Sequence, residues 1–498
     1  MKKTPWLTHF QTAGLLLLAI VGAEVSAVGQ SRAPAALTIA DGVYPYIRFE
    51  QLLERMPRSP EYLAPLQEQV DRAVGALFGR DMERALRLLD QAVLFEMVKA
   101  TPETAHMAAA SLSIEATGTP PKELTLTSRY SLGQPTESSL SYMLRLRSPQ
   151  GELRWQQPLE LPPSSDGSWN VSMPVQLSNY DLAGSTGPIG ISLLCQDGIE
   201  IPIGQIYLYS QPLSKQRQSQ NAQLEKAAPL PPELTRPASR FADRNAQLRD
   251  FRHPSRLDDH LLDRSLLANQ LDEELTALKS GIDPYENATG DRWFLINCAQ
   301  GKLPYRIYAP QTLINKSQDS PLPVIIALHG MGGNEHLFPE GYGGGTIKTL
   351  ADEHGFLLVS PRTYELAQSA DYLDALLEDV ANMYSIDHDR VYLLGHSLGA
   401  MTTMTLAAQR PGDIAAICAI AGDGRIPENA TIPPTLAYLA ENDWMVPAKA
   451  AEERIEQAQR AGTDIRSRLV PTAGHVLIVH MVLPDAIAWL MSQGVIPK

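Results

Sequence analysis

The C-terminal part of the chain, residues 289–498, alternates between short apolar runs and amphipathic segments. The apolar runs have strand length, and the segments between them repeat their apolar residues at helical spacing. We expect strands over residues 323–330, 356–361, 390–395, 414–422, 435–443 and 466–471, and helices over residues 347–354, 371–384, 400–409 and 449–462. Apolar strands that alternate with helices predict a doubly wound parallel sheet of the α/β class.

Two other patterns precede this region. A helical region is expected over residues 28–108, because two series of apolar residues recur at helical spacing and predict a helical hairpin: Val70, Val74, Leu77 and Phe78, then Leu86, Leu89, Val93 and Val98. Over residues 109–210 the period changes to two, with turn clusters such as SPQG and SSDG between short runs. This second pattern predicts a β-sandwich-like domain.

Residues 211–288 are expected to connect the two halves. Up to about residue 256 they are rich in Gln, Ser, Ala, Pro and Arg, which favours a linker. A helix is then marked on one face by Leu267, Leu271, Leu275 and Leu278.

The N-terminus has the pattern of a secretory signal peptide. Lys2 and Lys3 precede the apolar run AGLLLLAIVGA at residues 13–23, and the small residues of VSA follow. We therefore assign residues 1–27 to a signal peptide and expect a secreted or periplasmic protein; an uncleaved N-terminal anchor is the alternative. No other run is long enough to span a bilayer, so we expect no stable membrane insertion after cleavage.

Charge and cysteine content narrow the classes of partner and cofactor. The 498-residue chain has a net charge of −14, which disfavours nucleic acid as a partner. Its three cysteines, Cys195, Cys298 and Cys418, are far apart and have no metal-ligand spacing, so we expect buried thiols. The aspartates of SIDHDR are expected to cap a turn. We predict no metal and no cofactor.

A candidate nucleophile follows the strand at residues 390–395. The sequence GHSLG places Ser397 between that strand and the next helix, which is the context that a nucleophile elbow requires. A serine hydroxyl needs a base that accepts its proton. The two downstream histidines are His475, in the loop after a strand, and His480, inside a helix pattern. The loop position favours His475 as the base.

The acid that orients the histidine should end a strand between Ser397 and His475. Asp443 follows the strand LAYLA and fits this position best. Asp423, after the preceding strand, is the rival, and Glu441 falls two residues too early. The resulting order Ser, Asp, His is that of α/β-hydrolases.

An acyl-transfer site also needs backbone N–H donors for the oxyanion. Leu398, directly after the nucleophile, should supply one. The second should come from HGMGG at the end of the first predicted strand, and we choose Met331, whose amide follows the His-Gly turn.

Several segments resemble secreted bacterial α/β-hydrolases. They are TGDRWFLINCAQGKLPYRIYAP, PVIIALHGMGGNEHLF, IDHDRVYLLGHSLGAM, AENDWMVP and TAGH, and the resemblance extends over about residues 289–498. The set is similar to the poly(3-hydroxybutyrate) depolymerase and feruloyl-esterase group, and prolyl-oligopeptidase-type catalytic domains are related to it. The resemblance implies a serine carboxylesterase with Ser397, Asp443 and His475 as its triad and a small-molecule or polymeric ester as substrate.

Two other functions compete with this interpretation. One is a prolyl-oligopeptidase-type peptidase, which would share the catalytic domain, and the other is an envelope binding protein with a relict hydrolase domain. Trp444, beside the candidate acid, is expected to contact substrate. Because every candidate catalytic group follows His329, we expect a chain that starts near Leu261 to fold and act on small esters.

Overall fold

The structure is a computed structural model that describes residues 37, 39–118, 121–148, 150–174, 188–207, 212–249, 263–313, 320–422 and 431–494. The predicted signal peptide, residues 1–27, lies outside these ranges and stays a prediction. Within them, no helix combines the length and the apolar character needed to cross a membrane.

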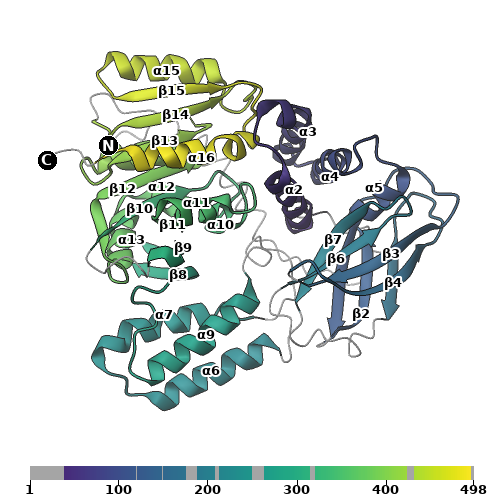
Figure 1. The fold of residues 1–498 in the computed structure, drawn as a ribbon, viewed down its shortest axis with the longest axis horizontal. Coiled ribbons are helices and arrows are strands. Elements are labelled where there is room, and N and C mark those ends of the chain that lie inside the picture. Colours follow the sequence, from purple (N-terminus) through teal and green to yellow (C-terminus); the bar gives the residue numbers. More distant parts are fainter. Residues whose placement is uncertain are drawn as a thin grey trace, which may run out of the picture. The chain divides into compact units, whose positions relative to one another are not determined.

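An eight-stranded mixed sheet organises the C-terminal part (Figure 1). Its strands are β8 (Gly290–Cys298), β9 (Gly301–Ala309), β10 (Leu322–Leu328), β11 (Leu357–Pro361), β12 (Ile386–His396), β13 (Ala416–Ile420), β14 (Thr435–Ala440) and β15 (Ile465–Val470). They lie in the order β15-β14-β13-β12-β10-β11-β9-β8. The strands from β10 to β15 are parallel, as predicted, whereas the β8–β9 hairpin joins β11 in antiparallel pairing and was not expected.

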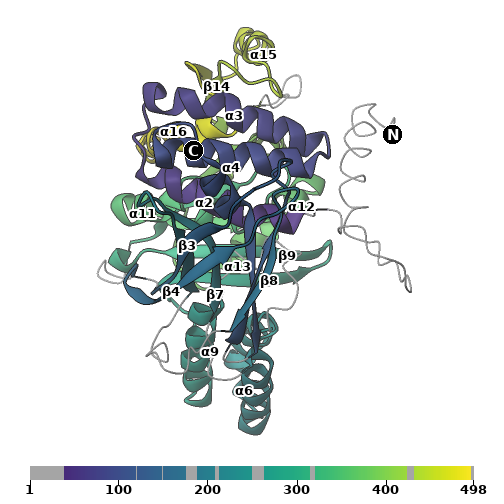
Figure 2. The ribbon, with the colours of Figure 1, turned by 90° about the vertical axis from the view of Figure 1, so that its right-hand side faces the viewer.

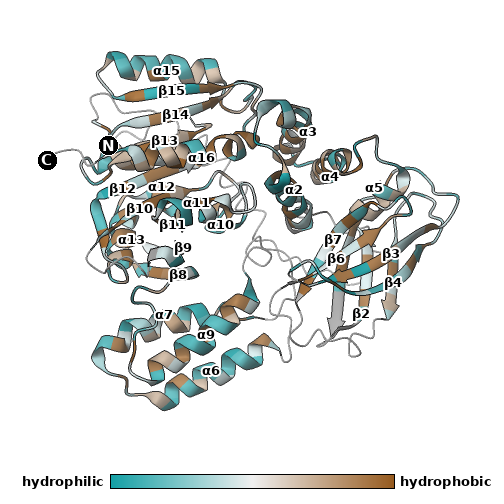
Figure 3. Ribbon diagram, viewed as in Figure 1, coloured by the Kyte–Doolittle hydropathy of each residue, from teal (hydrophilic) through white to brown (hydrophobic). Residues whose placement is uncertain are grey.

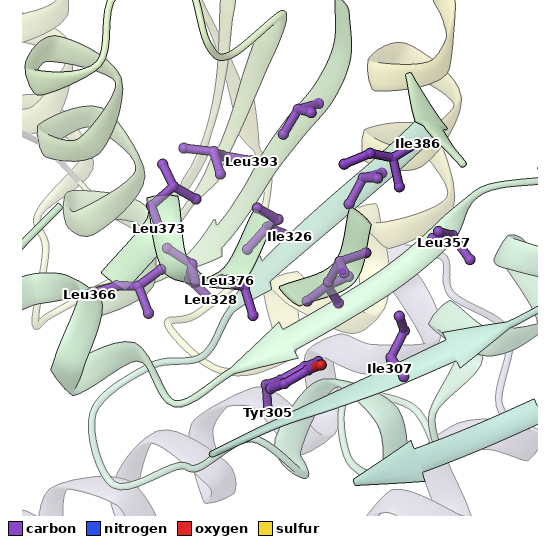
Figure 4. Close-up of a cluster of buried hydrophobic side chains, with 14 of the residues drawn as sticks. Tyr305, Ile307, Ile326, Leu328, Leu357, Leu366, Leu373, Leu376, Ile386 and Leu393 are labelled. Carbon is purple, nitrogen blue, oxygen red and sulfur yellow. The ribbon is translucent and has the colours of Figure 1, made fainter. Parts of the chain in front are cut away.

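Helices cover both faces of this sheet, because alternate residues of its strands bury on opposite sides. Ile326 of β10 packs into a cluster with α12 (Thr363–Gln368), α13 (Asp371–Ala381) and α14 (Leu398–Gln409). Figure 4 shows part of this cluster, with Ile326, Leu366 and Leu373 labelled. Ile325, the neighbour of Ile326, packs on the other face with α11 (Thr346–His354) and α16 (Leu477–Ser492). Figure 3 shows hydrophobic residues along the central strands of this sheet. This arrangement confirms the predicted α/β class.

The helix α15 (Ala448–Arg460) packs beside β14 and β15, and the short α10 (Leu337–Glu340) follows β10. The predicted helices and strands of this part thus agree with the structure to within a few residues at their ends. The candidate site residues follow the carboxyl ends of β10, β12, β14 and β15, which is the edge where parallel sheets of this class place their active sites.

Two antiparallel sheets form the predicted β-sandwich-like region. β1 (Leu112–Gly118), β2 (Pro121–Ser128) and β5 (Asn170–Pro174) make one, and β4 (Leu153–Leu161), β3 (Leu140–Arg147), β6 (Pro188–Leu194) and β7 (Glu200–Tyr207) make the other. Side chains of both sheets share one buried cluster, to which Leu126, Leu144 and Trp169 contribute. The helix α5 (Thr104–Ser111) precedes β1 and packs against β7.

The N-terminal helical region contains more helices than the predicted hairpin. A 3-10 turn (Ile39–Gly42) leads into α2 (Val43–Arg55), which is followed by α3 (Pro60–Phe78) and α4 (Met82–Val98), and Figure 2 shows the three α-helices side by side. Leu77 and Phe78, predicted to face the partner helix, are exposed instead. They lie in the last turn of α3.

These helices share a hydrophobic cluster with the end of the chain. Phe49 and Leu53 of α2 and Leu63, Leu66 and Val70 of α3 bury together with Leu477, the first residue of α16. Leu477 is fully buried in this cluster. The helical region and residues 289–498 are therefore joined by an apolar interface, against the expectation that a chain starting near Leu261 is self-sufficient.

The expected linker is largely helical where it is described. It contains α6 (Leu213–Ala227), a 3-10 turn (Pro232–Leu234) and α7 (Thr235–Asn245), and the predicted leucine helix follows as α9 (Arg264–Lys279). The few apolar side chains of the polar stretch, such as Leu213 and Phe241, bury against Leu271 of α9. Arg244 is also fully buried, paired with Glu274. The polar composition wrongly predicted a linker, because only a few apolar side chains pack these helices against α9.

Candidate active site

Ser397 lies in a strained turn between β12 and α14. Its φ and ψ angles are 54° and −114°, a region that non-glycine residues rarely adopt. The flanking glycines permit the turn, since a Cβ on Gly399 would lie 1.9 Å from the carbonyl oxygen of Leu328, and one on Gly395 would lie 2.4 Å from the backbone of Gly399. The Ser397 N–H donates to the carbonyl of Ile420 at 2.9 Å. This is the geometry of a nucleophile elbow.

The structure brings the predicted nucleophile, base and acid together. Nε2 of His475 lies 2.9 Å from Oγ of Ser397, and Nδ1 of His475 lies 2.7 Å from Oδ2 of Asp443. The imidazole and the carboxylate are both buried, at 4% and 5% exposure. An ionised carboxylate can only accept, so Nδ1 carries the proton and Nε2 is left to accept from the serine hydroxyl.

The second oxygen of Asp443 fixes its carboxylate. Oδ1 accepts the N–H groups of Met445 and Val446 at 2.9 and 2.8 Å, in the turn that follows β14. The rival acid, Asp423, lies outside the described residues. Glu441 points elsewhere, since its carboxylate accepts the N–H of Thr472 at 2.8 Å.

His480, the alternative base, is not part of this cluster. It lies in α16, buried at 2% exposure, and Arg58 donates to its backbone carbonyl at 3.4 Å. Burial, reinforced by the charge of Arg58, lowers the pKa of His480 to about 4. These surroundings fit a neutral packed residue, as the helix pattern predicted.

The turn after β10 contains Met331, one of the two predicted oxyanion donors. Among the described residues, the amide of Gly332 donates to the Tyr364 hydroxyl at 2.7 Å and that of Gly333 to the carbonyl of Gly330 at 3.2 Å. The Met331 amide precedes these two groups in the turn. Leu398 begins α14, and the N–H at the start of a helix has no partner within it. Both residues stay predicted oxyanion donors.

A buried histidine pair that the sequence did not reveal supports these turns. His329 is fully buried; its Nε2 accepts the N–H of Thr363 at 3.0 Å, so Nδ1 carries the proton and donates to the carbonyl of Gly330 at 2.8 Å. Burial lowers the pKa of His329 to about 4, which keeps the ring neutral. His329 therefore shapes the HGMGG turn.

His396, the residue before the nucleophile, contacts the base directly. Its Nε2 lies 2.8 Å from the backbone carbonyl of His475, and its Nδ1 lies 2.6 Å from the Tyr342 hydroxyl. Burial and the neighbouring His475 lower the pKa of His396 to about 3. Because a carbonyl only accepts, Nε2 carries the proton of the neutral ring and Nδ1 accepts from Tyr342. No sequence motif pairs these residues, since the contact joins segments distant in the chain.

Trp444 lies at the mouth of a crevice beside the acid. Its side chain is 49% exposed, and it lines a cavity of about 550 Å³ together with Asn442, Thr472 and residues of α3, among them Gln67 and Asp71. The helical region therefore forms one side of the space next to the triad. A role for Trp444 in substrate binding stays a prediction.

Among the described residues, one group has metal-ligand types close together: His106, Cys195 and Asp197. Nδ1 of His106 accepts the N–H of Glu103 at 3.0 Å, so Nε2 carries the proton and donates to Asp197 at 2.8 Å. The nitrogen that faces the group thus has no lone pair for a metal. Burial raises the pKa of Cys195 to about 12, against a thiolate ligand. All three cysteines of the chain are free thiols.

Part of the chain is similar to curated esterases, although no family model matches it. It is 32% identical over 124 residues to a bifunctional acetylxylan esterase/xylanase of Neocallimastix patriciarum, 30% over 120 residues to a feruloyl esterase B of Neurospora crassa and 33% over 121 residues to a feruloyl esterase B of Thermothelomyces thermophilus. The aligned parts are 23%, 21% and 21% of this chain, and span 17%, 38% and 39% of those relatives.

Solved structures similar to this one are also serine hydrolases and esterases. An S-formylglutathione hydrolase of Staphylococcus aureus covers 41% of this chain with 98% of its own, at 16% identity and a TM-score of 0.35. A ferulic acid esterase of Anaeromyces mucronatus covers 41% with 90% of its own, at 16% identity and a TM-score of 0.35. The α/β-hydrolase fold of the C-terminal part is evident from its own strand order and nucleophile elbow.

Proposed function

We propose that this protein is a serine hydrolase that cleaves carboxylic esters, with Ser397 as nucleophile, His475 as base and Asp443 as orienting acid. The observation that carries the proposal is the pair of contacts at His475, 2.9 Å to the serine oxygen and 2.7 Å to the carboxylate. The partial similarity to acetylxylan and feruloyl esterases supports ester cleavage as the reaction.

In the first half of the reaction, Oγ of Ser397 attacks the ester carbonyl while Nε2 of His475 takes the hydroxyl proton. The tetrahedral oxyanion is held by the N–H groups of Met331 and Leu398. Asp443 stabilises the imidazolium, because its Oδ2 already accepts from Nδ1 in the resting enzyme. Collapse breaks the C–O bond, and His475 gives its proton to the departing alcohol.

In the second half, water attacks the acyl group on Ser397 and gives a proton to His475. Collapse of this intermediate returns the proton to Oγ and releases the carboxylic acid. These reaction steps require no electron transfer and no reactant other than the ester and water. The triad and two backbone N–H donors are therefore sufficient for the reaction.

The substrate class proposed is an ester of a small or polymeric alcohol. The named relatives include esterases for acetyl and feruloyl groups. The exposed ring of Trp444 beside the crevice would contact the part of such a substrate that extends from the reacting carbonyl.

Labelling with a fluorophosphonate tests the nucleophile. The wild-type protein should be labelled at Ser397 and should hydrolyse acetyl and feruloyl esters faster than peptide amides. Ser397→Ala should abolish labelling and lower kcat by several orders of magnitude. Ser492→Ala, at the end of α16, is the control and should behave as wild type. Labelling that persists in Ser397→Ala, or preferred cleavage of amides, would contradict the proposal.

We also propose export, on the pattern of residues 1–27. The mature protein should then begin at residue 28. N-terminal sequencing of the protein recovered from the medium or periplasm tests this, and a chain that still begins at Met1 in the membrane fraction would favour the anchor instead.

A further inference from the structure

We infer that Glu50, in the N-terminal helix α2, is a positioning residue for His475 and acts through Tyr342 and His396. The inference rests on the proposed function, because it concerns the base of the same triad. Its basis is a continuous series of contacts that begins in the helical region and ends at the backbone of the base.

The series begins at a buried carboxylate. Glu50 is 4% exposed, and its Oε2 accepts the N–H of Gly343 at 2.6 Å. Burial raises the pKa of Glu50, and hydrogen bonds from the Tyr46 hydroxyl and from backbone amides of residues 342–344 offset only part of this effect. The carboxylate is thus directed at one loop, residues 341–345.

This loop has a backbone that requires an anchor. Tyr342, Gly343, Gly344 and Gly345 have φ angles of 45°, 78°, 67° and 75°, so four successive residues lie in the left-handed region. Tyr342 is the one residue of the four that carries a side chain, and it is strained there. A buried acceptor that gathers the amides of this turn stabilises the strained conformation, and Glu50 is placed to do so.

The hydroxyl of Tyr342 forms hydrogen bonds with two parts of the site. The Tyr342 hydroxyl donates to Nδ1 of His396 at 2.6 Å and accepts the N–H of Gly330 at 3.4 Å. Its ring packs edge to face against His396, with centroids 5.3 Å apart. Tyr342 therefore contacts both the turn before Met331 and the residue before Ser397.

The last contact reaches the base. Nε2 of His396 donates to the carbonyl of His475 at 2.8 Å, and the two imidazoles have centroids 5.1 Å apart. This bond holds the backbone from which the His475 ring extends towards Ser397. Loss of any step should displace the ring, and the effect should fall on kcat more than on KM, because none of these groups faces the crevice beside Trp444.

The test compares Glu50→Ala, Glu50→Gln and Tyr342→Phe in the full-length protein. Glu50→Ala and Tyr342→Phe should lower kcat about ten- to a hundredfold, as expected for a displaced catalytic group, with KM changed less than about threefold. Glu50→Gln keeps an oxygen that can accept from Gly343 and should restore most of the activity. Tyr392→Phe is the control, because it removes a tyrosine hydroxyl hydrogen bond of similar length, 2.8 Å to the carbonyl of Gln493, from a residue of β12 that is not part of this series.

The double variant shows whether Glu50 and Tyr342 act on His475 through the same series of contacts or independently. If Glu50 acts through Tyr342, combining Glu50→Ala with Tyr342→Phe should cost no more than the larger single loss. Losses that multiply would overturn the inference, as would a wild-type kcat in Glu50→Ala.

A readout without substrate distinguishes failure of this inference from failure of the proposed function. In protein labelled with ¹⁵N at histidine, the ring signals of His475 should shift in Glu50→Ala and in Tyr342→Phe, and should be unchanged in Tyr392→Phe. If the wild type is not labelled by fluorophosphonate, the proposed function fails, and these shifts still test the coupling. Unchanged His475 signals in both variants would overturn the inference even in an active enzyme.

Discussion

The carboxylate of Glu441 accepts the backbone N–H of Thr472 at 2.8 Å and so ties the loop of the acid to the loop of the base. The neighbouring residue, Asn442, adds a second link, because its N–H donates to the carbonyl of Ala473 at 2.8 Å. Thr472 has a φ of 58°, a conformation that needs support in a non-glycine residue. The glutamate that lies too early to be the catalytic acid thus holds the two loops at a fixed separation.

Replacing Glu441 should therefore loosen the site without removing a catalytic group. We expect Glu441→Ala to lower the free energy of unfolding by about 1 kcal/mol, the usual contribution of one hydrogen bond, and to lower kcat only a few-fold. Urea unfolding and ester kinetics measure the two effects. A loss of activity as large as that of a triad variant would mean that Glu441 takes part in catalysis.

Asp443→Asn should be far more severe. Both carboxylate oxygens accept N–H groups, Oδ1 from the backbone and Oδ2 from His475. An asparagine has one oxygen, and with that oxygen on the backbone amides its NH₂ group faces Nδ1 of His475. The imidazole must then carry its proton on Nε2, where it cannot accept from Ser397.

We accordingly expect kcat to fall by about three to four orders of magnitude, with the circular dichroism spectrum unchanged. Asp423→Asn is the matched comparison, because it tests the rival acid by the same chemical change. A mild Asp443→Asn beside a severe Asp423→Asn would reverse the assignment.

Acid should destabilise the protein partly through His480. Its pKa is about 4 in the folded protein, because burial and Arg58 lower it, against about 6.5 for an unfolded chain. Between these values the unfolded chain binds a proton that the folded chain does not, so stability is lost as the pH falls through this window. His480→Gln should flatten the dependence by up to about 1.4 kcal/mol per pH unit. Urea unfolding between about pH 7 and pH 4 measures this, and an equally steep profile in the variant would contradict it.

A chain that starts at Leu261 should aggregate or lose activity, contrary to what the position of the catalytic groups suggests. It lacks Phe49, Leu53 and Leu63, which cover Leu477 at the start of α16. Sedimentation and phosphonate labelling of the shortened chain test this. Supplying residues 28–108 as a separate polypeptide should restore part of the labelling, and a soluble, active short chain would show that the apolar interface is dispensable.

The strand and helix pattern from residue 323 onward was predictable because each element carries its own periodicity, whereas the β8–β9 hairpin before it was not. Ser397 and His475 could also be proposed from the sequence, since a nucleophile elbow and a loop after a strand are local features. Asp443 followed from its place at the end of β14. These residues share a property: the identity of each and its position relative to one strand are sufficient to propose its role.

The remaining features depend on contacts between distant segments. His396 is hydrogen-bonded to Tyr342 and to His475, and neither partner is near it in the chain. No local sequence pattern could therefore have predicted its role. The helices α6 and α7 are similar, because Leu213 and Phe241 bury only once α9 is present. Polar composition predicted a linker there, and tertiary packing overrode it.

The cluster around Leu477 brings the start of the described chain against its final helix, and this arrangement sets an order in time. Leu477 emerges from the ribosome long after α2 and α3, so these helices must wait until their partner in α16 has been synthesised. Contacts of such sequence separation also form slowly. A nascent chain halted before residue 475 has neither His475 nor Leu477, and so lacks both the base and the residue that α2 and α3 pack against. Hydrolytic activity should therefore arise only after α16 has been synthesised.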